Sequence, residues 1–143
     1  KLFIFNVTMQ NHGGYEEEYD NTLSVKLYTT IYYTRKVESG KKYLKLTKVS
    51  GGISDKDSVV TITSQLLRIG CADRLTSSQQ LERYPTGSSF SYSIPANWKY
   101  VEENSTLYSV GSYYEVTMKR GSSTGSWKYG MSNFLDLSLA SFS

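Results

Sequence analysis

The amino-acid sequence predicts an all-β fold, an antiparallel β-sandwich. Tyr is unusually common, with 13 residues against 5 Phe and 2 Pro, and Tyr is enriched in strands. Apolar and polar residues alternate over several segments, which is the period of a half-buried strand. Turn-forming residues recur between these segments, and no segment has a convincing helical period. The 143 residues are enough for one domain with a buried core.

The N-terminal region differs in character from the rest of the chain. Leu2–Gln10 is apolar and predicts a strand, and Asn11–Gly14 has the residues of a turn. Tyr15–Asn21 is acidic. We therefore divide the chain into residues 1–21, an N-terminal arm or attached strand, and residues 22–143, the β-sandwich domain.

The first half of that domain contains three predicted strands. Leu23–Thr34 alternates cleanly, Glu38–Lys41 is a tight turn, and Tyr43–Val49 is the return strand of a hairpin. Ser50-Gly51-Gly52 opens the next loop. Val59–Ile69 is a long strand, and the consecutive apolar residues Leu66 and Leu67 predict a bulge or bend.

The second half begins with an irregular segment, Cys71–Pro85, which has room for a short helical turn. Later strands are marked by alternation or by aromatic residues: Ser89–Ile94, a short one at Trp98 and Tyr100, Leu107–Lys119, Trp127–Met131 and Phe134–Leu139. Gly121–Gly125 is a hairpin loop. Seven to nine strands result. In the adjacent pairs Tyr32-Tyr33 and Tyr113-Tyr114, one ring of each must point outward.

Composition excludes several kinds of site. One Cys forms neither an internal disulfide nor a Cys-based zinc site, and one His excludes a multi-His metal centre. Asp55 and Asp57 have a spacing that can bind a cation, but we interpret their Gly- and Ser-rich loop as an ordinary turn. Cys71 follows an apolar stretch and is expected to be a reduced, partly buried thiol. We expect no enzymatic activity, no metal and no cofactor.

Aromatic residues are the candidate ligand-binding residues, because flat rings stack on sugars. These are Trp98, Tyr100, Trp127 and Tyr129. The alternative is that both Trp residues anchor the core. The surplus of exposed Tyr also suits a protein interface, since Tyr offers a large contact area at a low entropic cost.

A basic group flanks the first hairpin: Arg35, Lys36, Lys41, Lys42, Lys45 and Lys48. We interpret it as a solvated face or a protected sheet edge, because Lys commonly guards edge strands from aggregation. The net charge of +3 is too small to indicate nucleic-acid binding. No apolar run is long enough for a spanning helix, so no membrane partner is expected.

The string Phe5-Asn6-Val7-Thr8-Met9-Gln10-Asn11-His12-Gly13-Gly14-Tyr15 resembles a segment of the sulfatase-like phosphoglycerol transferases, the lipoteichoic acid synthase group. The resemblance covers about the first 21 residues. In that family the His that matches His12 lies beside the substrate phosphate in a metal-dependent site. That site needs further His, Asp, Glu and Thr residues in a much larger α/β domain. We therefore interpret the segment as a fused or borrowed strand, not as an active site.

The remaining 120 or so residues resemble the small Ser/Thr/Tyr-rich β-sandwich structural proteins of phages and prophages of Gram-positive bacteria. The likeness is carried by Tyr32–Val37, Lys45–Gly52, Ile69-Gly70-Cys71 and Val116–Ser123. It implies an immunoglobulin-like fold and a non-enzymatic role in the virion or tail. The partners would be other virion proteins or further copies of the chain, joined by edge strands, Tyr-rich faces and an extended N-terminal arm. The alternative is a carbohydrate- or cell-surface-binding module, which would be extracellular or on the cell surface.

Overall fold

A computed structural model describes residues 10–20, 24–73, 76, 79–103, 109–122 and 125–135. This part of the chain contains nine β-strands and no helix, so it holds no helix able to cross a membrane. The strands are β1 (Gln10–Tyr19), β2 (Val25–Glu38), β3 (Lys41–Lys56), β4 (Val60–Ala72), β5 (Gln80–Arg83), β6 (Ser89–Ser93), β7 (Val101–Glu102), β8 (Ser109–Arg120) and β9 (Trp127–Phe134).

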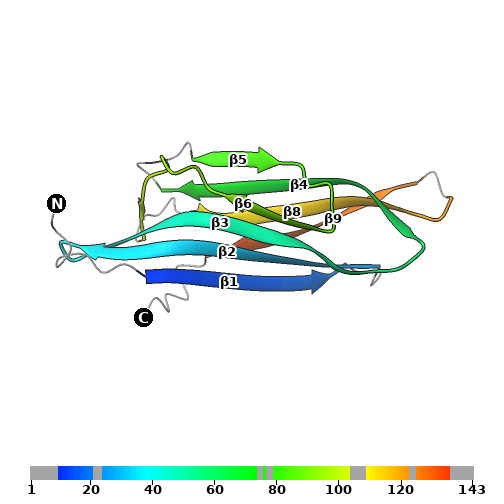
Figure 1. Ribbon diagram of the computed structural model, residues 1–143, viewed down its shortest axis with the longest axis horizontal. Coiled ribbons are helices and arrows are strands. Elements are labelled where there is room, and N and C mark those ends of the chain that lie inside the picture. Colours follow the sequence, from blue (N-terminus) through cyan, green and yellow to red (C-terminus); the bar gives the residue numbers. More distant parts are fainter. Residues whose placement is uncertain are drawn as a thin grey trace.

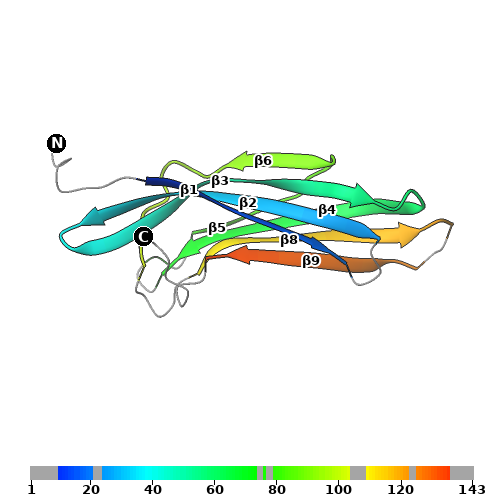
Figure 2. The ribbon, with the colours of Figure 1, turned by 90° about the horizontal axis from the view of Figure 1, so that it is seen from below.

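The strands form two antiparallel sheets. The first, sheet A, has the order β1-β2-β3-β6, and β7 also pairs with β3; the second, sheet B, has the order β5-β4-β8-β9. Figures 1 and 2 show the two layers with their strands along the long axis of the molecule. β1 lies beside β9 at one side, and β3 lies beside β4. The prediction of an all-β antiparallel fold is confirmed.

The core lies between the two sheets because the inward side chains of both are apolar. β2 contributes Val25, Leu27 and Ile31, and β8 contributes Val116 and Met118. Each of these five side chains is fully buried. As expected from the adjacent pairs, Tyr33 and Tyr114 point inward while their neighbours Tyr32 and Tyr113 do not.

Tyr114 is the largest fully buried side chain, and its hydroxyl has a partner inside the core. The hydroxyl donates to Gln65 Oε1 at 2.5 Å, and Gln65 Nε2 donates to the Gly87 carbonyl at 2.8 Å. A buried phenol without an acceptor would destabilise the fold. The chain of bonds therefore fixes the segment before β6 to β4 and β8.

A buried ion pair lies at the end of sheet A where β2 turns into β3. Arg35 Nε contacts Glu103 Oε2 at 3.0 Å, and both side chains are only 6% exposed. The backbone N–H of Glu103 donates to the Lys42 carbonyl, which places this residue directly after β7. Arg35 therefore belongs to the interior and is separated from the lysines of the basic group.

The predicted tight turn at Glu38–Lys41 is confirmed. Ser39 and Gly40 have φ angles of 51° and 78°, so both central residues are left-handed. Such a two-residue turn matches the twist of the strands that it connects. β2 and β3 consequently pair residue against residue from the turn onward, beginning with Glu38 and Lys41.

The predicted turn at Asn11–Gly14 is wrong, because these residues form the first half of β1. Each of them pairs with a residue of β2, and Gly14 lies opposite Ile31. A Cβ on Gly14 would lie 3.3 Å from Ile31 Cγ1, so glycine here permits close packing instead of a turn. Of the predicted strand Leu2–Gln10, only Gln10 lies within the described residues.

Three further predictions for the middle of the chain are corrected. Ser50, Gly51 and Gly52 continue β3 instead of opening a loop, since all three pair with β2 and with β6. The irregularity of β4 lies between Ile62 and Ser64, not at Leu66-Leu67. The segment after Cys71 contains β5, whose short ladder with β4 no alternation pattern revealed.

Two short strands shift relative to their predicted positions. β7 is Val101–Glu102 and follows Trp98 and Tyr100 instead of including them. β9 begins at Trp127 as predicted but continues past Met131 to Phe134. Residues 136–139 of the predicted last strand lie outside the described part.

Candidate interaction surface

The outer face of sheet A gathers many of the tyrosines and lysines. Alternation along β2 buries Leu27, Ile31 and Tyr33, which leaves Lys26, Tyr28, Tyr32 and Lys36 on the other side. β1, β3 and the segment before β7 add further residues to the same face. We call this set the Tyr-Lys face: Tyr15, Tyr19, Lys26, Tyr28, Tyr32, Lys36, Tyr43, Lys45, Lys48 and Tyr100.

A β-bulge in β3 brings two of these lysines to one face. Tyr32 pairs with Lys48 and Tyr33 pairs with Leu46, so Thr47 is an extra residue. Lys45 and Lys48, three positions apart, would otherwise point to opposite sides of the sheet. The bulge thus concentrates positive charge on the outer face.

The lysine ammonium groups lie over tyrosine rings. Lys36 Nζ lies 4.4 Å from the Tyr100 ring centroid and 5.5 Å from that of Tyr43. Lys45 Nζ lies 5.0 Å from the Tyr100 ring, and Lys48 Nζ lies 4.5 Å from the Tyr32 ring. These cation–π contacts hold the charged groups in place, each contributing about 0.5–1 kcal/mol at an exposed site.

The opposite half of the Tyr-Lys face contains acidic partners. Lys26 Nζ contacts Glu17 Oε1 at 2.7 Å, and the Tyr15 hydroxyl donates to Glu17 Oε2 at 2.7 Å. The hydrogen bonds from Lys26 and Tyr15 lower the pKa of Glu17. The Tyr19 hydroxyl donates to Asp55 Oδ2 at 2.9 Å, which raises the pKa of Tyr19. The face is thus positive near the β2–β3 turn and balanced in charge at the other end.

Two rings of this face remain open to a partner. Tyr15 and Tyr28 stack with their centroids 6.2 Å apart and their planes inclined by 28°. Tyr15 is 54% exposed, among the most exposed of the large aromatic side chains described. The two rings thus form an aromatic pair that joins β1 and β2 on this face.

The four predicted ligand-binding residues do not form one surface. Trp98 packs against the core, and Tyr100 lies over β3 beside Lys36 and Lys45. Trp127 and Tyr129 lie in β9 of the other sheet and also pack against the core. The Tyr129 hydroxyl donates to Glu18. Burial raises the pKa of Tyr129 most, and this hydrogen bond raises it further.

The basic group is also divided by the fold. Arg35 is buried in its ion pair with Glu103. Lys41 and Lys42 are exposed at the β2–β3 turn, while Lys36, Lys45 and Lys48 lie on the Tyr-Lys face. Sequence spacing alone does not reveal this division, because Arg35 is buried by a partner distant in sequence, and Lys45 and Lys48 share a face through the bulge at Thr47.

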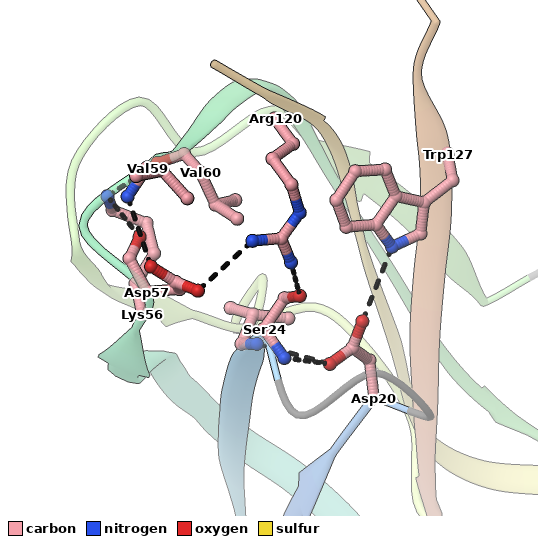
Figure 3. Close-up of polar contacts among 9 residues, drawn as sticks. Asp20, Ser24, Lys56, Asp57, Val59, Val60, Arg120 and Trp127 are labelled. Carbon is pink, nitrogen blue, oxygen red and sulfur yellow. Dashed lines mark hydrogen bonds and ion pairs between the residues drawn. The ribbon is translucent and has the colours of Figure 1, made fainter.

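A polar cluster joins three turns at the end of the molecule away from the β2–β3 turn (Figure 3). Arg120 Nη1 contacts Asp57 Oδ2 at 3.1 Å, and Arg120 Nη2 donates to the Ser24 hydroxyl. Asp20 accepts hydrogen bonds from the Ser24 N–H and from the Trp127 indole. The Val59 N–H and then Arg120 lower the pKa of Asp57.

Asp55 and Asp57, the two carboxylates whose spacing could bind a cation, have different partners in the structure. Asp57 is engaged with Arg120, and Asp55 accepts the hydrogen bond of Tyr19. Across the described ranges, no three His, Cys, Asp or Glu side chains come together as metal ligands. The cluster therefore connects turns and does not resemble a cation site.

An open groove of about 610 Å³ lies where β3 ends and β4 begins. Its lining includes Ile53, Lys56, Val60 and Ile62, and Gly87 from the segment before β6. A smaller hollow of about 300 Å³ continues along β4 between Ser64 and Pro85. Sequence reasoning missed this groove, since no motif marks a strand that lacks a neighbour.

Comparisons with known proteins give no match. No family model, no curated protein and no solved structure matches the chain. The Tyr-Lys face and the sequence resemblances are therefore the features that bear on function.

Proposed function

We propose that the chain is a non-enzymatic structural or accessory protein of a bacteriophage particle, acting in the virion or tail through contacts between subunits. Its fold in this proposal is an immunoglobulin-like β-sandwich. Other virion proteins or further copies of the chain are the partners. The likeness of residues 22–143 to phage structural proteins supports the setting, and the Tyr-Lys face supports the mode of action.

The Tyr-Lys face is the observation that carries this proposal. Six of the 13 tyrosines lie on one side of one sheet, among them Tyr15 and Tyr32. Tyr is enriched in protein interfaces because it buries a large area with few rotatable bonds. Cation–π contacts immobilise the lysines beside these rings, so less side-chain entropy is lost on association.

Many copies of a weak contact suffice in a regular assembly. Once one contact forms, the next has a high effective concentration, and affinity accumulates over the set. A flat face suits this mode of association, whereas a small-molecule site is normally concave and apolar.

The test is the mass in solution, measured by light scattering behind a sizing column over a range of concentrations. We expect the mass to rise with concentration or to correspond to a discrete oligomer. Replacing Tyr15 and Tyr32 together by Ser should lower the mass at a given concentration. Phe134→Ser is the matched control, because Phe134 is 44% exposed but lies at the end of β9 in the other sheet, which β8 separates from β4. A strict monomer, or equal loss in the control, would contradict the proposal.

A carbohydrate- or cell-surface-binding module is the second candidate, favoured by the open stack of Tyr15 and Tyr28. Binding to a panel of cell-wall and capsular glycans tests it. Loss of binding in Tyr15→Ala, with binding kept in Trp98→Ala and Trp127→Ala, would assign the ligand to this stack. A monomer without glycan binding would contradict both candidates.

A further inference from the structure

Half of β4 lacks a neighbour on one side. β8 pairs with β4 from Val60 to Ala72, whereas β5 pairs only with Leu67–Gly70. Among the described residues, no strand pairs with residues 60–66 on the side away from β8. Pro85 follows β5 closely, and a residue without an N–H cannot extend that ladder.

Particular backbone groups of β4 point into the open side. The Val60 N–H donates to the Asp57 carbonyl, so this N–H points away from β8. In an antiparallel ladder the residue two positions later has the same orientation, so the Ile62 N–H also points away from β8. At the other end, the Cys71 N–H donates to the Gln79 carbonyl on the β5 side. Alternate residues of a strand direct their N–H groups to the same side, so the N–H groups of Ile69, Leu67 and Gln65 also point to the β5 side. The N–H and C=O groups of Ile62 and Gln65 therefore face the groove.

The groove has the dimensions and lining of a strand site. Its lining combines the apolar residues Ile53, Val60 and Ile62 with several Ser and Thr residues and with Asp55 and Lys56. Volumes of about 610 and 300 Å³ lie end to end along β4, since both hollows are lined by Ile62 and Gln65. An added strand would satisfy the open backbone groups and place alternate side chains against the apolar residues of the lining.

We propose that this groove binds residues 1–9 of a second copy of the chain as an added β-strand. Phe3, Phe5 and Val7 alternate with Ile4 and Asn6, so one side of the segment is apolar. Nine extended residues span about 30 Å, and the seven-residue edge of β4 spans about 23 Å. The proposal rests on the proposed function and specifies which surfaces join neighbouring subunits.

The positions of donor and acceptor favour a second copy. In Figure 1 the strand β1, where the described chain begins, starts on the left, whereas β4 starts on the right. β1 also lies beside β9, at one edge of the two sheets. The open side of β4 is the side on which β5 pairs, which is the opposite edge of sheet B. Donation from one end into the far end of the next copy is a head-to-tail contact, which forms a ring or a filament.

Photochemical cross-linking of the full chain tests the proposal. p-Benzoylphenylalanine replaces Phe5, and equal amounts of isotopically light and heavy protein are mixed before irradiation. We expect cross-links between light and heavy copies that map to residues 60–66 or 84–88. Cross-links within one copy, or to other parts of another copy, would overturn the inference.

A pair of variants at Ile62 provides the matched control. Ile62→Pro removes the N–H that faces the groove and should abolish the cross-link, whereas Ile62→Val keeps the N–H and should preserve it. Circular dichroism checks that both variants fold. If Ile62→Pro does not fold, the cross-link map of the protein with native Ile62 decides the question alone. Concentration-dependent assembly with cross-links elsewhere would overturn this inference and leave the proposed function standing. A strict monomer would overturn both.

Discussion

The indole N–H of Trp127 donates a hydrogen bond to Oδ2 of Asp20 across 3.3 Å, which joins the turn after β1 to the start of β9. The other oxygen of Asp20 accepts hydrogen bonds from the N–H groups of Ser24 and Val25, at 2.6 and 3.2 Å. Asp20 is only 3% exposed. One carboxylate thus closes the turn between β1 and β2 and attaches it to the other sheet.

We expect Asp20→Ala to lower the free energy of unfolding by about 2–3 kcal/mol, because three donors lose their acceptor in a buried place. Asp55→Ala is the control, since this exposed carboxylate accepts one hydrogen bond at the surface. Its effect should stay within about 0.5 kcal/mol. Urea unfolding followed by tryptophan fluorescence measures both. Equal effects would show that Asp20 does not hold the turn.

The buried pair of Arg35 and Glu103 should show strong coupling. Glu103→Leu alone removes the carboxylate that the buried guanidinium contacts and should cost about 3–5 kcal/mol. The double variant Arg35→Met with Glu103→Leu should recover most of this loss. A double-mutant cycle gives the coupling free energy. Glu82→Leu breaks the exposed pair with Arg68 and should cost less than about 1 kcal/mol. Additive effects at Arg35 and Glu103 would contradict the prediction.

Gly52 should not tolerate a side chain. Its φ is 154°, and a Cβ would collide with the backbone of Ser88 and Ser89 where β3 meets β6. We expect Gly52→Ala to destabilise the protein by about 3 kcal/mol or more, from backbone strain and steric overlap together. Gly70→Ala, with nothing within 4 Å of the added carbon, should change stability by less than about 1 kcal/mol. Thermal unfolding of both variants decides, and similar melting temperatures would refute the prediction.

Burial raises the pKa of the Cys71 thiol from 9.0 to about 11. The folded protein at pH 8 should therefore react with iodoacetamide far more slowly than the unfolded chain. Because the thiol ionises first in the unfolded state, its contribution to stability is complete below pH 9 and is lost as pH rises to about 11. The loss is about 2 kcal/mol. Cys71→Ala should reduce this alkaline fall in the free energy of unfolding; an unchanged pH dependence would argue against it.

Much of the fold follows from local patterns. Alternation along β2 and β8 predicts which side chains are buried, and Ser39-Gly40 predicts the connecting turn. Patterns fail where a tertiary contact decides. Gly51 and Gly52 have turn-like composition, yet both continue β3, where β2 and β6 approach their backbones too closely for any side chain.

The Tyr-Lys face was harder to predict for the same reason. Lys45 and Lys48 share a face only because of the bulge at Thr47, and no sequence pattern marks that bulge. Tyr100 joins them from a separate segment. Aromatic content alone selected Trp127 and Tyr129, which the fold places in the other sheet beside the acidic residues of β1.

The placement of β1 and β9 has a mechanical consequence. β1 starts with Gln10 and β9 ends with Phe134, and the start of β1 lies on the same side of the molecule as the end of β9 (Figures 1 and 2). A force that pulls these two points apart acts across the strands, so it opens the β1–β2 ladder one residue pair at a time, beginning with Gln10 and Arg35. A force between Gln10 and the distant β8–β9 turn acts along the strands and loads the whole ladder at once. The protein should therefore yield at low force in the first geometry and resist in the second.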